Sequence, residues 1–216
     1  MTTFLGTAAV ERVYDRIGAL QDTQAFYEDP ALAALLRHGA FERAHSVYEA
    51  GCGTGRVARR LLREVLPYDC RYVGADVSAH MLATTRSRIA AFPNACVIRA
   101  DVAAFRPAGS FDRVLSLFVV DLMSDAQVAA FLRCAYDVLA DGGLLCVAGL
   151  AEGERGIARA VSAIWKRVHD VAPAIVGGCR PGSIVRHLPL QRWRILEAEH
   201  QCAYGVSSEA VVAVKA

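Results

Sequence analysis

The sequence has seven cysteines but no C-x-x-C pair. The thiols are scattered and odd in number, a pattern that argues against a disulfide framework and against a structural zinc site. We therefore expect free cysteines, no bound metal ion and a reducing, cytoplasmic environment.

Long hydrophobic runs are also missing. No stretch approaches the ~20 apolar residues that a membrane-spanning helix needs. The first residues, MTTFLGTAAVERVYDR, have neither the basic start nor the apolar centre of a signal peptide. A formal net charge of +2 does not by itself indicate nucleic-acid binding. What is present is a chain of 216 residues, 54% of them apolar, which suffices for one domain with a full core.

Strand and helix patterns alternate through the middle of the chain. We expect strands at residues 46–50, 70–76, 95–101, 111–122 and 144–150. Helical patterns follow at 56–66, at 79–91 and from the capping box Ser124-x-x-Gln127 to Leu139. Five strands with four helical crossovers predict an α/β fold, a doubly wound parallel sheet with helices on both faces.

The two ends of the chain depart from this alternation. Residues 1–45 read as helices that break at Asp29-Pro30, with Pro30 in the first turn of the second helix and Asp29 as its cap. After residue 150 we expect a helix from about Arg155 to Val171 and a loop rich in Gly and Pro. Two strand-like segments then follow, 192–203 and 209–216. The short gap between them predicts an antiparallel hairpin at the edge of the sheet.

A glycine-rich turn follows the first strand, in the stretch VYEAGCGTGRVARRLL at residues 47–62. The dinucleotide fingerprint needs Gly or Ala where this chain has Arg56, and the phosphate loop needs a Gly-Lys-Ser/Thr that is absent. The spacing is instead an acid followed by three alternating glycines, starting at Glu49. The turn therefore matches neither phosphate-binding pattern.

At this point the chain resembles the class I S-adenosylmethionine-dependent methyltransferases. Five segments carry the resemblance in the expected order: EAGCGTG, GADVSAHML, ADVAAF, FDRVLSLFVVDLMSD and LADGGLLCVAGL. The resemblance implies a Rossmann-like, mostly parallel seven-stranded sheet with an antiparallel C-terminal edge hairpin and an N-terminal helical cap. It also implies S-adenosyl-L-methionine as cofactor and S-adenosyl-L-homocysteine as product. We expect one methyltransferase domain made of a cap (1–45), a cofactor-binding core (46–150) and a substrate-side insertion with the hairpin (151–216).

The resemblance assigns cofactor contacts to the strand ends. The expected set is Glu49, Gly51, Cys52, Gly53, Gly55, Asp76, Val77, Met81, Asp101, Val102, Leu117 and Phe118. Asp76 would bind the ribose hydroxyls, Asp101 with the backbone of Val102 the adenine, and Glu49 the ammonium group. Other interpretations remain open: helix caps for Asp76 and Asp101, core packing for Met81, and an ion pair with an arginine for Glu49.

Catalytic candidates are Asp121, which follows the apolar run of the fourth strand, His169, and Tyr14 on the cap. Candidate substrate contacts are Tyr27, Trp165 and Arg180. A helix-start acid, a structural histidine and ordinary packing are the competing interpretations.

The sequence gives the least information about the methyl acceptor. No Asn/Asp-Pro-Pro-Tyr/Phe box and no Pro-Cys follows the fourth strand, so a nucleic-acid base is not expected. The segment from Arg155 to Arg194 contains seven Arg and one Lys but only one acid, Asp170. This excess of positive charge would fit binding of an anionic small molecule, contact with an anionic membrane surface, or simply a solvated basic face. We predict transfer to O, N or C of a small molecule. A lipid or quinone methyltransferase and a non-catalytic cofactor-binding regulatory protein are the alternatives.

Overall fold

The computed structural model describes Ala9, Arg12 and residues 22–216. Its strands are β1 (Ser46–Ala50), β2 (Arg71–Asp76), β3 (Ala95–Arg99), β4 (Phe111–Leu117), β5 (Leu139–Leu150), β6 (Trp193–Ala203) and β7 (Val206–Lys215). Its helices are α2 (Ala25–His38), α3 (Arg56–Glu64), α4 (Ala79–Ile89), α5 (Asp125–Val138) and α6 (Gly156–Val171). Short 3-10 turns are η2 (Phe41–Arg43), η3 (Val120–Leu122), η4 (Pro173–Val176) and η5 (Val185–His187).

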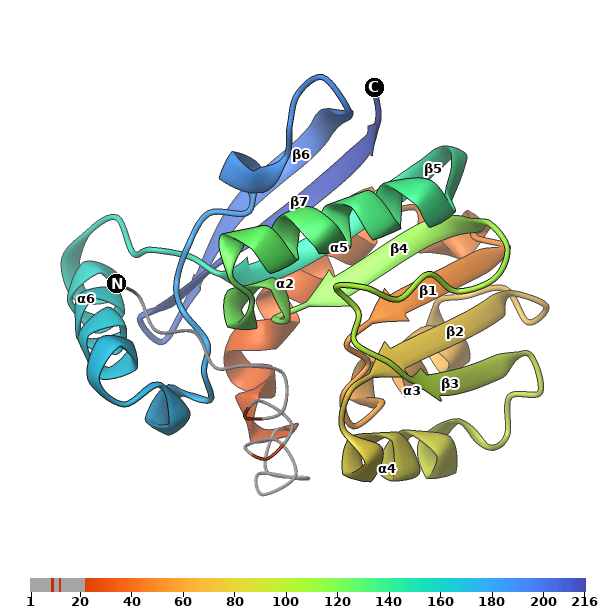
Figure 1. Cartoon of the computed structure of the whole chain (residues 1–216), viewed down its shortest axis with the longest axis horizontal. Coiled ribbons are helices and arrows are strands. Elements are labelled where there is room, and N and C mark those ends of the chain that lie inside the picture. The colour runs from red at the N-terminus through yellow and green to blue at the C-terminus, as the bar shows by residue number, and fades with distance from the viewer. Residues whose placement is uncertain (1–8, 10–11, 13–21) are drawn as a thin grey trace.

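All seven strands form one sheet in the order β3-β2-β1-β4-β5-β7-β6 (Figure 1). The first five strands pair in parallel, and β7 runs antiparallel to both β5 and β6. The predicted mixed sheet and its antiparallel hairpin are therefore confirmed. The strand order reverses between β1 and β4, and in such sheets ligands bind beyond the carboxyl ends of the strands at that point.

Helices cover both faces of the sheet, as predicted. On one face α2, α3 and α4 bury residues such as Leu35, Leu61 and Ile89 in a common cluster. On the other face α5 buries Val128 and Phe131, and in Figure 1 it crosses in front of the strands. The α5 capping box between Ser124 and Gln127 is also present.

Three expectations about connections and boundaries were wrong. The link from β3 to β4, residues 100–110, contains turns and no helix among the described residues, so three helices rather than four join the first five strands. Strand β4 ends at Leu117 because Phe118 takes a φ of 53°, which leaves the extended region, and η3 follows. The helix expected to start at Pro30 starts at Ala25, so Pro30 lies inside α2.

The hairpin turns through Tyr204 and Gly205, with φ values of 52° and 85°. Positive φ at both central residues matches the twist that two-residue hairpins prefer. The turn places β7 against β5, and Leu144 to Leu150 pair along its length.

Candidate functional site

The glycine-rich turn after β1 needs its glycines for two reasons. Gly51, Gly53 and Gly55 have φ values of 82°, 52° and 75°, a region that other residues rarely adopt. There is also no room for a side chain at position 51, because a Cβ on Gly51 would lie 2.2 Å from a methyl group of Val119. The backbone of this turn therefore approaches its surroundings more closely than any side chain would allow.

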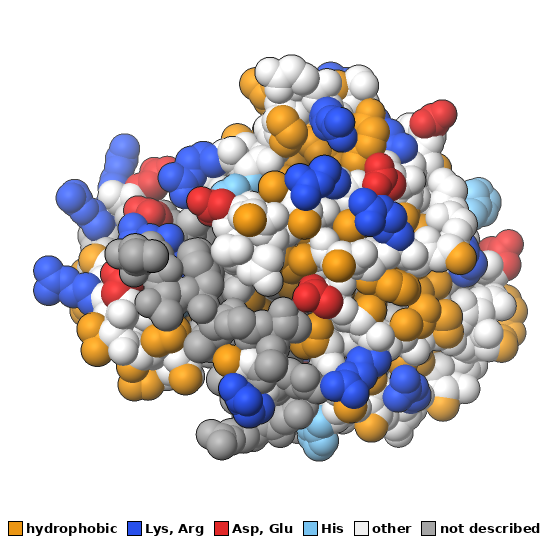
Figure 2. Space-filling view, viewed as in Figure 1, with side chains coloured by type: hydrophobic (Ala, Val, Ile, Leu, Met, Phe, Trp, Pro, Cys, Tyr) orange, Lys and Arg blue, Asp and Glu red, His pale blue; other side chains and the backbone are white. Residues whose placement is uncertain are grey.

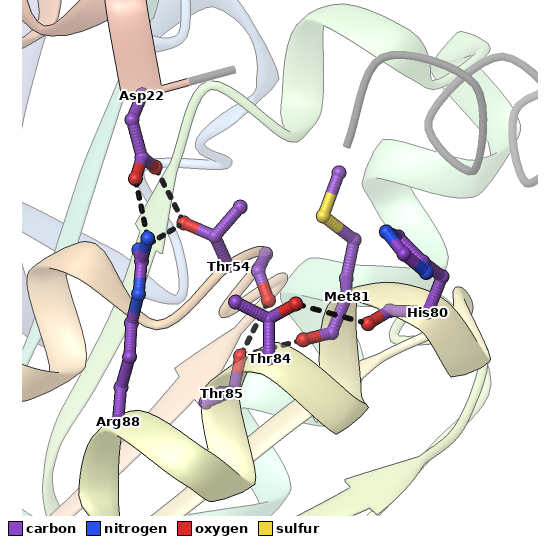
Figure 3. Close-up of polar contacts among 8 residues, drawn as sticks. Asp22, Thr54, His80, Met81, Thr84, Thr85 and Arg88 are labelled. Atoms are coloured by element: carbon purple, nitrogen blue, oxygen red, sulfur yellow. Dashed lines mark hydrogen bonds and ion pairs between the residues drawn. The ribbon is translucent and has the colours of Figure 1, made fainter. Parts of the chain in front are cut away.

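Helix α4 supports the turn from below (Figure 3). The hydroxyl of Thr85, which is fully buried, donates to the carbonyl oxygen of Gly53 at 2.6 Å. Arg88, one helical turn further on, donates to the Thr54 hydroxyl at 2.9 Å and to the Asp22 carboxylate at 2.7 Å. Thr54 in turn donates to Asp22 at 2.6 Å, and the three side chains point toward one another in Figure 3. The turn is thus held to α4 and to the residues that precede α2.

A second set of ion pairs joins the same turn to α2. Arg56, the first residue of α3, lies 2.7 Å from Glu28 and 2.6 Å from Asp29. Burial raises the pKa of Glu28, while Arg56 acts in the opposite direction. Arg56 is the residue that breaks the dinucleotide fingerprint, and its side chain here connects the helical cap to the turn.

The two strand-end aspartates lie where the sequence predicted them. Asp76 at the end of β2 accepts from the backbone N–H of Gly53 and from that of Ser78, both at 2.9 Å. Asp101, after β3, accepts from the N–H of Ala103 at 3.0 Å. Asp76 therefore joins the end of β2 to the glycine-rich turn, and Asp101 stabilises the turn after β3. Neither residue is the N-cap of a helix, because Ser78 caps α4 and no helix begins directly after Asp101 in the described chain.

Glu49 is the most buried carboxyl of the turn, with 2% exposure at the end of β1. Its hydrogen-bond partner is the hydroxyl of Tyr72, at 2.5 Å, rather than an arginine. Burial raises the pKa of Glu49 to about 8, so the neutral form predominates at pH 7 unless a cation lies beside it. An ammonium group at this position would be the charge that ionises it.

The apolar members of the expected cofactor set line the same edge of the sheet. Cys52, Met81, Val102 and Phe118 are buried, whereas Val77 and Leu117 are half-buried. Their positions after β1, β2, β3 and β4 follow the carboxyl ends of four adjacent strands.

Asp121 lies in η3, just beyond β4, with 7% exposure. Its Oδ2 accepts from the backbone N–H of Leu150 at 2.9 Å, and its carbonyl oxygen accepts from that of Arg180 at 3.0 Å. Burial raises the pKa of Asp121 to about 8. The side chain is therefore a buried acid that can exchange a proton near neutral pH.

A pocket of about 330 Å³ opens beside Asp121. It lies among η3, the start of α5, the end of β5, α6 and the loop 180–187. The charged side chains that line it are Asp121, Asp125, Glu152, Lys166, Arg180 and Arg186. Two predicted site residues, Asp121 and Arg180, thus meet in one cavity at the ends of β4 and β5.

The comparisons with known proteins agree with this arrangement. Residues 47–143, which hold the glycine turn, both aspartates and Asp121, match the model of the family described as Methyltransferase domain. Over this part of the chain the sequence is similar to that family, in agreement with the resemblance seen in its motifs. No curated protein sequence matches it significantly.

Solved structures with the same fold share little sequence with this chain. The N-methyltransferase NodS from Bradyrhizobium japonicum WM9, in complex with S-adenosyl-L-homocysteine, is 16% identical over 97% of each chain, with a TM-score of 0.66. The [4+2]-cyclase SpnF is 16% identical over 100% of this chain and 99% of its own, with a TM-score of 0.70. The magnesium protoporphyrin IX methyltransferase ChlM from Synechocystis PCC 6803 is 18% identical over 94% and 86%, with a TM-score of 0.64. At these identities the likeness establishes the fold, and the cyclase shows that the fold alone does not determine the reaction.

Two of the remaining predicted site residues lie apart from the charged pocket. Tyr27, on α2, is 6% exposed, and its ring centroid lies 5.5 Å from that of Phe118. Trp165, on α6, donates from Nε1 to the carbonyl oxygen of Cys179 at 2.9 Å. Both rings pack in the cluster beneath the loop that carries Arg180. They support this loop and do not line the pocket.

Of the other two catalytic candidates, one lies away from the pocket and one is not described by the structure. His169 is fully buried near the end of α6 and does not line the pocket, where His187 is the histidine present. Tyr14 lies outside the described residues. Among the described residues no group of three or more His, Cys, Asp or Glu side chains could hold a metal ion.

Sequence reasoning missed the ion pairs that hold the glycine turn. Arg56 pairs with residues 27 and 28 positions earlier, and Arg88 pairs with Asp22 across 66 positions. No local pattern marks such distant partners. The available signal was Arg56 itself, a charged residue at a position where a glycine motif would otherwise continue.

Proposed function

We propose that this chain is a methyltransferase that transfers the methyl group of S-adenosyl-L-methionine to a small-molecule acceptor, at an O, N or C atom. The observation that carries the proposal is the position of Asp121. It lies beyond β4, beside a pocket of about 330 Å³ that is separate from the glycine turn. One edge of the sheet therefore offers a cofactor seat and an acceptor cavity side by side.

The residues present fit the cofactor at three points. Gly51, Gly53 and Gly55 bring backbone close to a ligand, and Asp76 offers a carboxylate at the distance along the chain that suits ribose hydroxyls. Glu49 is a carboxyl whose pKa is raised by burial, and an ammonium group beside it would favour its ionised form. When bound, the cofactor supplies an electrophilic methyl group on a sulfonium.

The protein contributes to the reaction by aligning the acceptor atom with the methyl carbon and by removing the acceptor's proton. In-line displacement forms a bond from the acceptor atom to the methyl carbon as the carbon–sulfur bond breaks, so positioning supplies much of the rate. Asp121 accepts the proton that an O–H or N–H acceptor loses. Its carboxylate is held by the N–H of Leu150, which favours the ionised form against burial.

The test is detection of a methylated product. The purified chain is incubated with S-adenosyl-L-methionine and a panel of small acceptors, and both S-adenosyl-L-homocysteine and the methylated acceptor are measured by mass spectrometry. We expect both to accumulate together with at least one acceptor. Cofactor binding by calorimetry with no product from any acceptor would favour the alternative, a cofactor-binding protein without catalysis. Binding of NAD without binding of S-adenosyl-L-methionine would contradict the cofactor assignment.

A lipid or quinone acceptor at a membrane surface is the second candidate, because α6 exposes an apolar stripe. Ile157, Ile164 and Val171 are spaced seven residues apart and are 77%, 63% and 87% exposed. Exposed arginines of α6 flank the stripe, and Figure 2 shows basic and hydrophobic side chains together at this end of the molecule. No helix among the described residues is long and apolar enough to cross a membrane. Flotation with anionic vesicles tests this candidate, and absence of binding would count against it.

A further inference from the structure

The loop that carries Arg180 is fixed at two points. The backbone N–H of Arg180 donates to the carbonyl oxygen of Asp121 at 3.0 Å, and that of Gly182 donates to Leu150 at 2.9 Å. Pro181 lies between the two bonds and is itself buried. The base of the Arg180 side chain is therefore held in place before any ligand arrives, which lowers the entropic cost of binding.

Arg180 has an unpaired donor among the described residues. Its Nε is buried and forms no hydrogen bond within the described part of the chain. Neither Arg180 nor Arg186, both of which line the pocket, has a carboxylate within 4.0 Å among the described residues. A buried donor without a partner costs free energy, so a group that accepts from it is expected.

Among the other charged groups of the pocket, Lys166 and Glu152 offset each other in an ion pair of 2.8 Å. The side chain of Asp125 is 91% exposed, so solvent screens its charge. Asp121 has its pKa raised to about 8 by burial, so it is mostly neutral at pH 7. An excess of positive charge thus remains at Arg180 and Arg186.

Apolar side chains also line the pocket, beside the polar Ser183 and His187. They include Val128 and Leu132 of α5, Val147 of β5 and Ile184 of the loop. A ligand in this cavity can place apolar atoms against these side chains and an anionic group against Arg180.

We propose that this pocket binds the methyl acceptor through a carboxylate or phosphate group, which Arg180 holds from within and Arg186 approaches from the rim. Arg forks suit both groups, because two parallel N–H donors match two oxygens. That the ligand is the methyl acceptor rests on the proposed function; that the pocket binds an anion does not.

The test uses small probes on the full chain without cofactor. Benzoate, phenyl phosphate and the neutral benzamide are titrated against the protein, and binding is followed by ligand-observed NMR. We expect both anions to bind and benzamide to bind at least ten-fold more weakly. The tighter of the two anions identifies a carboxylate or a phosphate as the preferred group.

Variants locate the site. Arg180→Met should weaken anion binding ten-fold or more, Arg180→Lys should restore part of it, and Arg186→Met should have a smaller effect. Arg194→Met makes the same chemical change at an exposed position of β6, away from the pocket, and should bind as the wild type does. Circular dichroism checks that each variant folds, and Arg180→Lys serves in place of Arg180→Met if the latter does not.

Three results would overturn the proposal: equal binding of benzoate and benzamide, no binding of either anion, or unchanged binding in the Arg180 variants. Calorimetry with S-adenosyl-L-methionine is run separately. If the wild-type chain binds the anions but not S-adenosyl-L-methionine, the methyltransferase proposal is rejected and the anion site stands. If it binds S-adenosyl-L-methionine but neither anion, only the anion site is rejected.

Discussion

Gly149 and Asp121 meet in one confined space where β5 and β4 end. A Cβ on Gly149 would lie 2.2 Å from Oδ1 of Asp121, closer than any real contact. The absence of a side chain at position 149 is what lets the acid bond to the N–H of Leu150. The placement of the candidate base thus depends on a glycine in β5, the next strand along the chain.

Gly149→Ala should therefore displace the Asp121 side chain. We expect a lower melting temperature and slower methyl transfer, because the bond to Leu150 is lost and the acid leaves its position. Gly182→Ala is the control for stability, since a Cβ there meets nothing within 4 Å. Equal melting temperatures of the two variants would contradict the close contact between a Cβ at position 149 and Asp121.

Asp121→Asn keeps the shape of the side chain and removes its ability to accept a proton. We expect turnover to fall by ten-fold or more, the usual range for a general base, while affinity for S-adenosyl-L-methionine stays nearly unchanged. In the wild type, turnover should rise with pH through about 8, where half of the Asp121 carboxyls are ionised, and level off above it; this rise should be absent from the variant. Wild-type turnover in Asp121→Asn would show that the residue has no catalytic role.

Stability of the cofactor-free protein should fall as pH rises. Burial raises the pKa of Asp121 from 3.8 to about 8 and that of Glu49 from 4.5 to about 8. Between these values the unfolded chain has released protons that the folded chain retains, so the free energy of unfolding decreases with pH. Urea unfolding at pH 5, 6.5 and 8 measures the slope, and Asp121→Asn should reduce it. A stability that increases over this range would contradict the assignment of both groups.

Asp76→Ala should weaken S-adenosyl-L-methionine binding ten-fold or more, because hydrogen bonds to a charged group are worth about 1.5–3 kcal/mol. The variant also loses the bond to the N–H of Gly53, which shapes the turn. Asp76→Asn separates the two effects, since it preserves the size of the side chain but lacks the charge. Calorimetric affinity equal to that of the wild type in both variants would remove Asp76 from the site.

Asp22 and Arg88 should be energetically coupled through Thr54. The ion pair is 2.7 Å long with side chains 28% and 25% exposed, so we expect a coupling of roughly 0.5–1 kcal/mol in a double-mutant cycle. Asp22→Asn and Arg88→Gln form the cycle, measured by urea unfolding. Each single variant should also weaken cofactor binding a few-fold, because Thr54 belongs to the glycine turn. Additive effects on stability would mean that the contact is not energetically significant.

The parts that could be predicted from sequence are those with local causes. Alternating glycines predict a turn with positive φ, and an acid after an apolar run predicts the end of a strand, as at Asp76. The end of β4 could not be predicted, because Leu117, Phe118 and Val119 are equally apolar and only the backbone angle of Phe118 separates strand from turn. The roles of Arg56 and Arg88 depend on partners distant in sequence, so they emerge only once the chain is folded.

The order of strands in space differs from the order in which the ribosome makes them. β6 is synthesised before β7, yet it reaches the sheet only through β7, which lies between it and β5. Until residues 206–215 emerge, the backbone of β5 presents an unpaired edge made of mostly apolar residues, and β6 has nothing to pair with. Such an edge is prone to join other chains. During synthesis the chain is therefore prone to aggregate after β1 to β5 are made and before β7 is made. A chaperone that shields strand edges would act during that interval.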